Sequence, residues 1–165
     1  MIVVADSSPL VALVSIAAIE ALPRLFGVVL IPPAVLAELR SPRRSSAVQA
    51  FADRPPAWLE VHDPLCVDPI AGLHAGEQAA LALALERHAD LVLIDETLGR
   101  RAASQRRLRV AGTVGVLERA AEFDLLDLPS AFERLKATDF WINPAILEQR
   151  LAAFLEKQNR RGSSG

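Results

Sequence analysis

The sequence predicts a three-layer α/β/α sandwich with a central parallel sheet. Short apolar runs such as IVVA, VVLI and LVLI alternate with longer segments of helical composition along the 165 residues. The runs are apolar throughout instead of alternating with polar residues, which is typical of strands buried on both faces. The hydrophobic content of 52% excludes intrinsic disorder and supplies a sizeable core for one domain.

The order of elements follows from these runs and from the helix-start and helix-stop residues between them. We expect strands at 2–5, 28–31, 58–62, 91–94 and 108–110. We expect helices from Ser8 to near Pro23, at 34–40, 45–54, 76–88, 100–107, 113–123 and 129–137, and from Pro144 onwards, with a loop at 63–75.

The C-terminal part is expected to differ from the rest of the chain. Residues 1–125 are predicted to form the α/β domain, 126–158 a helical extension and 159–165 a mobile tail. An apolar stripe at helical spacing predicts that the last helix packs on the domain, on a second copy or on a partner protein; its members are Ile146, Leu147, Leu151, Phe154 and Leu155.

Several classes of protein are excluded by residues that the chain lacks. The single Cys66 excludes a disulfide-stapled fold, and the scattered His62, His74 and His88 do not have zinc-ligand spacing. The first residues do not resemble a signal peptide, and no run of 18 apolar residues lacks a charge. We expect a cytoplasmic protein that does not bind membranes.

Acidic residues stand where a parallel sheet would gather them. Asp6 closes the first predicted strand, and Asp95, followed directly by Glu96, closes the fourth. Glu38 lies late in the helix after the second strand, and Glu77 lies in the first turn of the helix before the fourth. Ligands of parallel α/β sheets bind at the carboxyl ends of the strands, so these acids could face one crevice. Carboxylates held close together need a cation, and hard oxygen ligands favour Mg²⁺ or Mn²⁺.

Each acid also has a purely structural interpretation. Asp6 could cap the helix that follows it, and Glu77 near a helix N-terminus is favoured by the macrodipole alone. Glu38 could be a solvated residue on the face of a short helix. Four acids at such places together still favour a cation site.

Arginines adjoin the predicted acidic crevice. The first 135 residues contain no lysine, because Lys136 and Lys157 are the only two in the sequence. Two arginine clusters are candidates for binding the phosphates of a polyanion; they comprise Arg40, Arg43 and Arg44, and Arg100, Arg101, Arg106, Arg107 and Arg109. The alternative is that both clusters are solvated helix faces.

Five segments in order resemble the PIN-domain family, specifically its small prokaryotic branch related to the toxins of virulence-associated toxin–antitoxin pairs. They are VVADSSPLVAL, LIPPAVLAELR, GEQAALALAL, LVLIDETLGRRAA and VAGTVGVLERA, and the resemblance covers about residues 1–125. It implies a parallel-sheet α/β/α fold and a Mg²⁺- or Mn²⁺-dependent endoribonuclease that acts on single-stranded or looped RNA. It further implies a small antitoxin protein as a partner, and the apolar stripe of the last helix predicts a homodimer.

The resemblance assigns roles to particular positions. The family's four acids fall on Asp6, Glu38, Glu77 and Asp95, as catalytic residues and metal ligands. The hydroxyl after the first acid is Ser7, and the small polar residue after the last strand is Thr113, which would orient a metal-bound water or the substrate. Members of this branch often carry two aspartates where this chain has Asp95 and Glu96, so Glu96 ranks below the other acids as a ligand.

Other families with acids at strand ends require residues that are absent here. Response-regulator receivers need a lysine at the end of the last strand, and haloacid-dehalogenase phosphatases need a second aspartate two residues after the first, plus a lysine. No phosphate-binding loop or dinucleotide fingerprint occurs. One alternative stays open: a PIN-like module that binds RNA or protein without cutting and uses the acids for a structural metal. The sequence likewise leaves open whether the chain is a toxin or a housekeeping nuclease.

Overall fold

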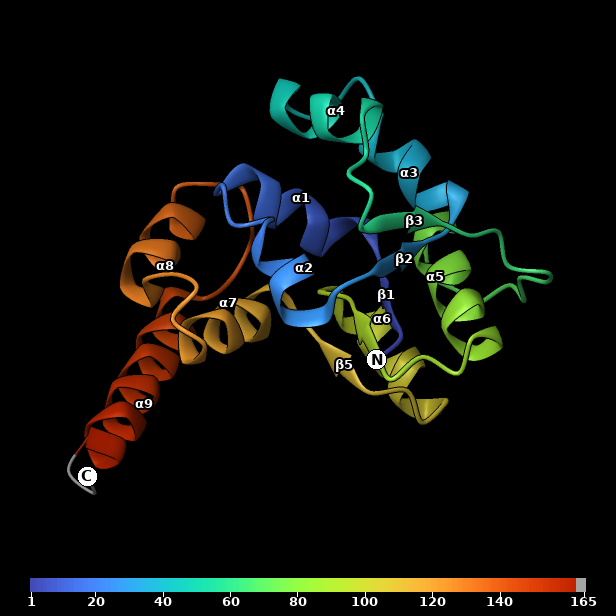
Figure 1. Cartoon of the computed structure of the whole chain (residues 1–165). Coiled ribbons are helices and arrows are strands. Elements are labelled where there is room, and N and C mark those ends of the chain that lie inside the picture. Colours follow the sequence, from blue (N-terminus) through green and yellow to red (C-terminus); the bar gives the residue numbers. More distant parts are fainter. Residues whose placement is uncertain (163–165) are drawn as a thin grey trace.

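The computed structural model describes residues 1–162 and contains one five-stranded sheet in which every strand pair is parallel. The strand order is β3-β2-β1-β4-β5 (Figure 1). The strands are β1 (Val3–Ala5), β2 (Val29–Ile31), β3 (Leu59–Val61), β4 (Leu91–Leu93) and β5 (Val110–Ala111). Each falls within or at the edge of a run that the sequence identified, so the five predicted strands are confirmed.

The first strand forms the centre of the sheet. Val4 pairs with Leu30 of β2 and with Val92 of β4, and all three residues of β1 are fully buried. A strand with neighbours on both sides and helices on both faces has no solvent-facing side. That burial is the physical reason why this run is apolar at every position.

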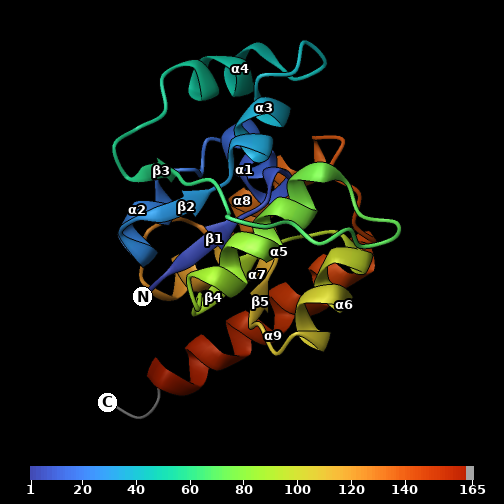
Figure 2. The same cartoon turned by 90° about the vertical axis from the view of Figure 1, so that its right-hand side faces the viewer.

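Helices cover both faces of the sheet, as the sandwich prediction requires. The helices before β4 are α1 (Ser7–Ser15), α2 (Ala21–Phe26), α3 (Pro33–Leu39), α4 (Ser46–Asp53) and α5 (Ala75–Glu86). Those after it are α6 (Thr97–Gln105), α7 (Thr113–Glu122), α8 (Leu128–Lys136) and α9 (Pro144–Gly162). The α1, α2 and α7 helices pack together on one face and α5 and α6 on the other, while α3 contacts both α1 and α5 (Figures 1 and 2).

One predicted helix proved to be two. The apolar segment expected to run from Ser8 to near Pro23 breaks after α1, where Ala17 takes a left-handed conformation with a φ of 56°. The chain resumes as α2 at Ala21, so that Pro23 lies in the first turn of α2. Proline is tolerated there because the first-turn N–H groups have no partner within the helix. Pro23 therefore marks a helix start, where the sequence analysis placed a helix end.

The C-terminal helices pack on the α/β domain. One side of α9 buries Leu147 and Phe154 and half-buries Leu151, whereas Ile146 and Leu155 stay substantially exposed. Ion pairs flank this contact: Arg150 binds Glu118 at 2.5 Å, and a second pair joins α9 to the end of α7. The helix continues through 159–162, the first part of the segment expected to be a mobile tail; the remainder, 163–165, lies outside the described residues. None of the helices in residues 1–162 combines the length and apolar character needed to cross a membrane.

The strand order creates a crevice beside β1. The chain leaves β1 to form β2 and β3 on one side and then returns to build β4 and β5 on the other side. The connections after β1 and β4 therefore run in opposite directions, and a crevice opens between them at their carboxyl ends. Residues that follow these two strands are thus placed at the usual ligand-binding position of such a sheet.

Candidate active site

Two predicted site residues flank the crevice because they follow its two strands. Asp6 comes directly after β1, and Asp95 comes two residues after β4. The two strand ends are joined by a hydrogen bond from the Asp6 N–H to the Leu93 carbonyl, with a length of 2.9 Å. The apolar runs of the sequence thus determined where these two acids would lie.

The Asp6 carboxyl group is buried without a full set of hydrogen-bond partners. Its side chain is 1% exposed, Oδ1 has no partner, and no hydrogen bond caps α1. Burial raises its pKa from an ordinary 3.8 to about 7, against the lowering effect of the Ser7 backbone N–H. The nearby carboxyl groups of Glu38 and Glu77 raise the pKa further. Asp6 occupies the N-cap position of α1 without a side-chain cap hydrogen bond, so capping alone does not account for this buried carboxyl group.

Glu77 combines a structural role with an unused oxygen. Its Oε2 accepts the backbone N–H of His74 at 2.9 Å, which stabilises the start of α5. Its Oε1 has no hydrogen-bond partner, although the side chain is only 4% exposed. A buried carboxylate oxygen without a donor costs on the order of 1–3 kcal/mol, so capping alone does not account for this residue.

Glu38 reaches across to two neighbouring helices. Ser7 donates its hydroxyl to Oε2 at 2.5 Å, and the backbone N–H of Gly76 donates to Oε1 at 2.9 Å. Ser7 begins α1 and Gly76 lies in the first turn of α5, so Glu38 at the end of α3 binds between two helix N-termini. The partial positive charge of helix N-termini favours a carboxylate there. Glu38 is therefore not the solvated face residue of the alternative interpretation.

Asp95 is held by the start of α7. Thr113 donates its backbone N–H to Oδ1 and its hydroxyl to Oδ2, both at 2.7 Å. Burial raises the pKa of Asp95, against the lowering effect of these two hydrogen bonds and of the Arg100 guanidinium. Thr113 is fully buried, so its hydroxyl serves Asp95 in this arrangement. The adjacent Glu96 is exposed.

Three glycines make room for three of the carboxylates. A Cβ on Gly76 would lie 2.6 Å from Cδ of Glu38, and one on Gly99 would lie 2.8 Å from Oε1 of Glu77. A Cβ on Gly112 would lie 2.7 Å from Oδ1 of Asp95. None of the three has a positive φ, so each position favours glycine because of a close approach: by a carboxylate at Gly76 and Gly112, and by both Ile94 and the Glu77 carboxylate at Gly99.

The structure thus brings the predicted acids together in two groups. Asp6, Glu38 and Glu77 interact with one another, whereas the charged neighbours of Asp95 are Arg100 and Glu96. Within residues 1–162, no three or more His, Cys, Asp or Glu side chains are arranged as a ready metal-binding group. The physical reason is that Glu38, Glu77 and Asp95 are turned towards protein donors. Asp6 Oδ1 and Glu77 Oε1 are the described buried oxygens that remain available to a cation.

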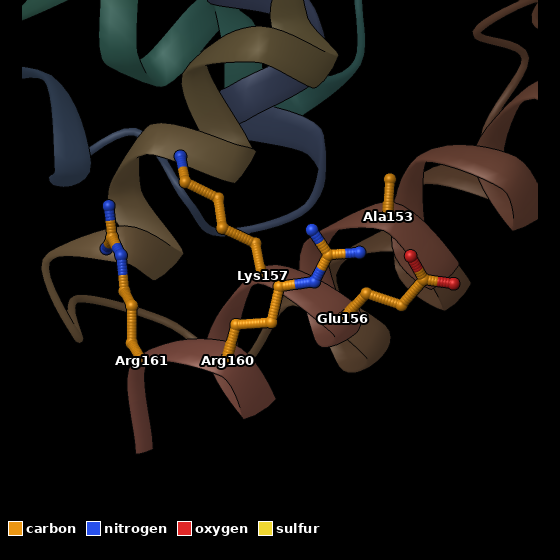
Figure 3. Close-up of a pocket in the computed structure, with 5 residues that line it drawn as sticks. All are labelled: Ala153, Glu156, Lys157, Arg160 and Arg161. Carbon is orange, nitrogen blue, oxygen red and sulfur yellow. The ribbon is translucent and has the colours of Figure 1, made fainter. Parts of the chain in front are cut away.

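A groove of about 1000 Å³ passes over this part of the molecule. Of the four predicted acids, Asp95 lines the groove, whereas Asp6, Glu38 and Glu77 are not among its lining residues. The lining also includes Glu96 and Arg100, together with Ser8 of α1 and Arg44, whose Nε donates to the Glu38 carbonyl. A smaller hollow of about 490 Å³ lies on the outer part of α9 among Ala153, Glu156, Lys157, Arg160 and Arg161 (Figure 3). That hollow contains none of the predicted site residues, so the groove is the candidate binding site.

The structure places the predicted arginines on different parts of the molecule. Arg100 lines the groove, but Arg101, Arg106 and Arg107 do not. The nine residues of α6 rise about 13 Å, and they carry the chain from the carboxyl edge of the sheet back to the amino end of β5. Arg106 and Arg107 follow α6 and therefore lie at the edge opposite the acids.

The other predicted cluster is also divided. Arg40 donates to the Ala52 carbonyl and pairs with Asp53, which ties it to α4, and neither Arg40 nor Arg43 is among the groove-lining residues. Arg44 of the same cluster does line the groove.

Sequence reasoning missed the contribution of the connection between α8 and α9. Residues 138–143 line the groove opposite α1, and Trp141 is 91% exposed there. The signal was present as an aromatic pair, Phe140 and Trp141, between two predicted helices. It was not used because the resemblance ended near residue 125.

Comparison with protein families agrees with the fold. A family model described as a PIN domain (DUF3368) matches residues 2–156, which is most of the chain. The chain therefore belongs to the PIN-domain family, and the match extends through most of α9. PIN domains are in general nucleases, a class of hydrolase, and typically use divalent metal ions. No curated protein matches the chain.

Proposed function

We propose that this PIN domain is a metal-dependent endoribonuclease that hydrolyses phosphodiester bonds of single-stranded or looped RNA. The observation that carries the proposal is the pair of buried, unpartnered carboxylate oxygens, Asp6 Oδ1 and Glu77 Oε1. Hard divalent cations prefer such oxygens, and a cation would relieve the desolvation that raises the pKa of Asp6 to about 7. The donor set thus fits Mg²⁺ or Mn²⁺.

In this proposal the four acids hold one or two cations. Asp6 and Glu77 supply their free oxygens, and Glu38 and Asp95 supply oxygens after exchanging hydrogen bonds with Ser7, Gly76 and Thr113. Glu96, which lines the groove beside Asp95, is a weaker candidate ligand. When bound, the ion supplies an activated water and stabilises the leaving oxygen of the phosphodiester.

The remaining roles fall to donors around the acids. Ser7 and Thr113 hold Glu38 and Asp95 in place through their hydroxyls. Arg100 donates one guanidinium N–H to the Ile94 carbonyl at 3.1 Å, which fixes the side chain at the groove wall. Its other N–H groups are suited to orient a phosphate of the bound strand. Arg44 occupies a similar position on the Glu38 side.

Thermal melting and RNA cleavage, measured on the same preparations, test this function. Wild type should melt at a higher temperature with Mn²⁺ and should cleave RNA, because a ligand that binds only the folded state stabilises it by about 2.7 kcal/mol at 100 times its Kd. Asp6→Asn should lose both effects. The surface variant Glu133→Gln, which removes a carboxylate 72% exposed to solvent, should retain both.

Two outcomes would contradict the proposal. No Mn²⁺-dependent shift in wild type would mean that the acids do not form a cation site. A shift that is lost in Asp6→Asn, without cleavage of any RNA tested, would favour a PIN module that binds RNA or protein around a structural metal.

We also propose a toxin role with protein partners, on the basis of the family resemblance. Expression of the chain in bacteria should then arrest their growth, and co-expression of a small protein encoded directly upstream should relieve the arrest. Expression of the Asp6→Asn variant should not affect growth. A homodimer is a further part of this proposal, and Leu155, which is 44% exposed on α9, is a site at which to test it. Light scattering after size-exclusion chromatography, on wild type and on Leu155→Glu, measures that association.

A further inference from the structure

Trp141 is a large aromatic side chain held out into water. The connection from 138 to 143 bends at 138 and 139 and has no helix or strand up to 143. Phe140 and Ile142, on either side of Trp141, pack partly buried against the core, whereas the Trp141 side chain does not. Its exposure is 91%.

Hydrogen bonds fix this connection at both ends. The Thr138 hydroxyl donates to the Leu135 carbonyl at 2.7 Å and accepts the Phe140 N–H at 3.2 Å. At the other end, the Asn143 side chain accepts the Ala145 N–H at 3.0 Å. These bonds order the residues on either side of Trp141, which lowers the entropy cost of a contact made by its ring.

The groove beside Trp141 has a mixed lining. Apolar side chains of α1, the connection and the start of α9 are interspersed with three guanidinium groups, those of Arg44, Arg100 and Arg150. Three carboxylates also line it, on Asp95, Glu96 and Asp139. The lining is thus balanced in formal charge, and the chain as a whole carries −2. Bulk attraction to phosphates does not supply the affinity for a polyanion here.

A ligand that fits such a groove has flat apolar faces as well as negative charges. Unpaired nucleotides have both, and aromatic side chains bind them by stacking on the base. Bases within a duplex are already stacked on one another and present no free face.

We propose that Trp141 stacks on an unpaired base of an RNA strand that lies in this groove, with Arg100 against its phosphates. The stacking makes the α8–α9 connection part of the substrate site and selects single-stranded over duplex RNA. The inference rests on the proposed RNA substrate and extends it to a residue outside the acidic cluster.

Fluorescence isolates the contact, because the sequence contains two tryptophans and no tyrosine. In the full chain carrying Trp58→Phe, Trp141 is the sole indole, and the new ring preserves packing against Phe51. Titration of this protein with an eight-nucleotide oligoadenylate in EDTA should quench the tryptophan emission saturably. The same should hold in Mg²⁺ when the chain also carries Asp6→Asn. An abasic oligonucleotide of the same length and the matching duplex should quench far less.

Affinity, measured by anisotropy of a labelled oligoadenylate, provides a second readout. Trp141→Ala should weaken binding about tenfold, the scale of one lost base stack, and Trp141→Phe should restore most of it. Equal quenching by the abasic strand would overturn the inference, as would binding that Trp141→Ala leaves unchanged.

Cleavage assays separate this inference from the proposed nuclease function. If Asp6→Asn abolishes cleavage and Trp141→Ala cleaves with the KM of wild type, the nuclease proposal holds and the stacking proposal is wrong. If the base-containing strand quenches Trp141 but no RNA is cleaved in Mg²⁺ or Mn²⁺, the stacking proposal holds and the nuclease proposal is wrong. Absence of both binding and cleavage would overturn both.

Discussion

The Ser7 hydroxyl donates a hydrogen bond of 2.5 Å to Oε2 of Glu38, 31 residues further along the chain. Ser7 is buried, and Glu38 lies at the end of α3. The bond links the first turn of α1 to the acid that α3 contributes. It therefore sets the position of one proposed cation ligand relative to Asp6.

Removing this hydroxyl should weaken the cation site more than the fold. Ser7→Ala leaves Glu38 with the Gly76 N–H as its remaining donor among those described, so we expect a loss of about 1 kcal/mol in unfolding free energy. The Mn²⁺ concentration for half-maximal cleavage should rise several-fold. Ser104→Ala, at an exposed site on α6, is the matched control. An unchanged metal requirement in Ser7→Ala would show that the bond does not position Glu38.

Glycine substitutions separate crowding of the acids from effects on the helices. Gly76→Ala puts a methyl group 2.6 Å from the Glu38 Cδ, so Glu38 must move and cleavage should fall by tenfold or more. Gly115, inside α7, has its nearest neighbour 3.9 Å from the added Cβ. Gly115→Ala should therefore raise the melting temperature, since alanine favours a helix by up to about 1 kcal/mol over glycine. Full cleavage by Gly76→Ala would contradict the crowding argument.

The buried Asp6 predicts how the stability of the metal-free protein depends on pH. Its pKa is about 7 in the folded state against 3.8 ordinarily, so between these values the folded state binds a proton that the unfolded state has lost. Stability should fall as pH rises through this window, by up to about 1.4 kcal/mol per pH unit, and should level off above it. Urea denaturation in EDTA from pH 5 to pH 8 measures the slope.

Asp6→Asn is the control for this pH dependence. It should flatten the slope and stabilise the metal-free protein above pH 7, because the amide has no charge to desolvate. A smaller slope of the same sign should remain, since burial also raises the pKa of Asp95. An identical slope in wild type and variant would mean that Asp6 does not titrate in this range.

The two ends of α6 give a matched pair of arginines. Arg100 lines the groove, whereas Arg107 lies beyond the helix near the opposite edge of the sheet. Arg100→Ala should weaken RNA binding and reduce its salt dependence by about one unit of slope. Arg107→Ala should change neither. Binding titrations at several salt concentrations measure the affinity and its salt dependence. An equal effect of the two variants would mean that the whole arginine cluster binds RNA.

The strands and most helix boundaries were predictable because their causes are local. An apolar run buried on both faces forms a strand, and proline, serine and glycine mark where helices begin and end. The break between α1 and α2 was not predictable in the same way. Residues 16–20 are mostly apolar, and the left-handed Ala17 that separates the helices reflects packing.

The identity of the site's acids was predictable from the sequence, but their hydrogen-bond partners were not. Asp6 and Asp95 were found because they end strands, and Glu38 and Glu77 because of their places on the neighbouring predicted helices; the family resemblance then assigned a role to all four. The hydrogen bonds that turn Glu38 and Asp95 towards protein donors join residues 31 and 18 positions apart. Such partners depend on how helices pack, and sequence spacing does not specify this.

The sequence by itself thus determined the parallel sheet, the two aspartates at the carboxyl ends of neighbouring strands, and the family to which such a pattern belongs. Tertiary structure alone decided that Glu38 binds between two helix N-termini, that Arg107 lies away from the acids, and that Trp141 lines the same groove as Asp95. The physical reason is that a strand end is fixed by local burial. The direction of a helix, and hence where its side chains meet others, is fixed by packing across the whole fold.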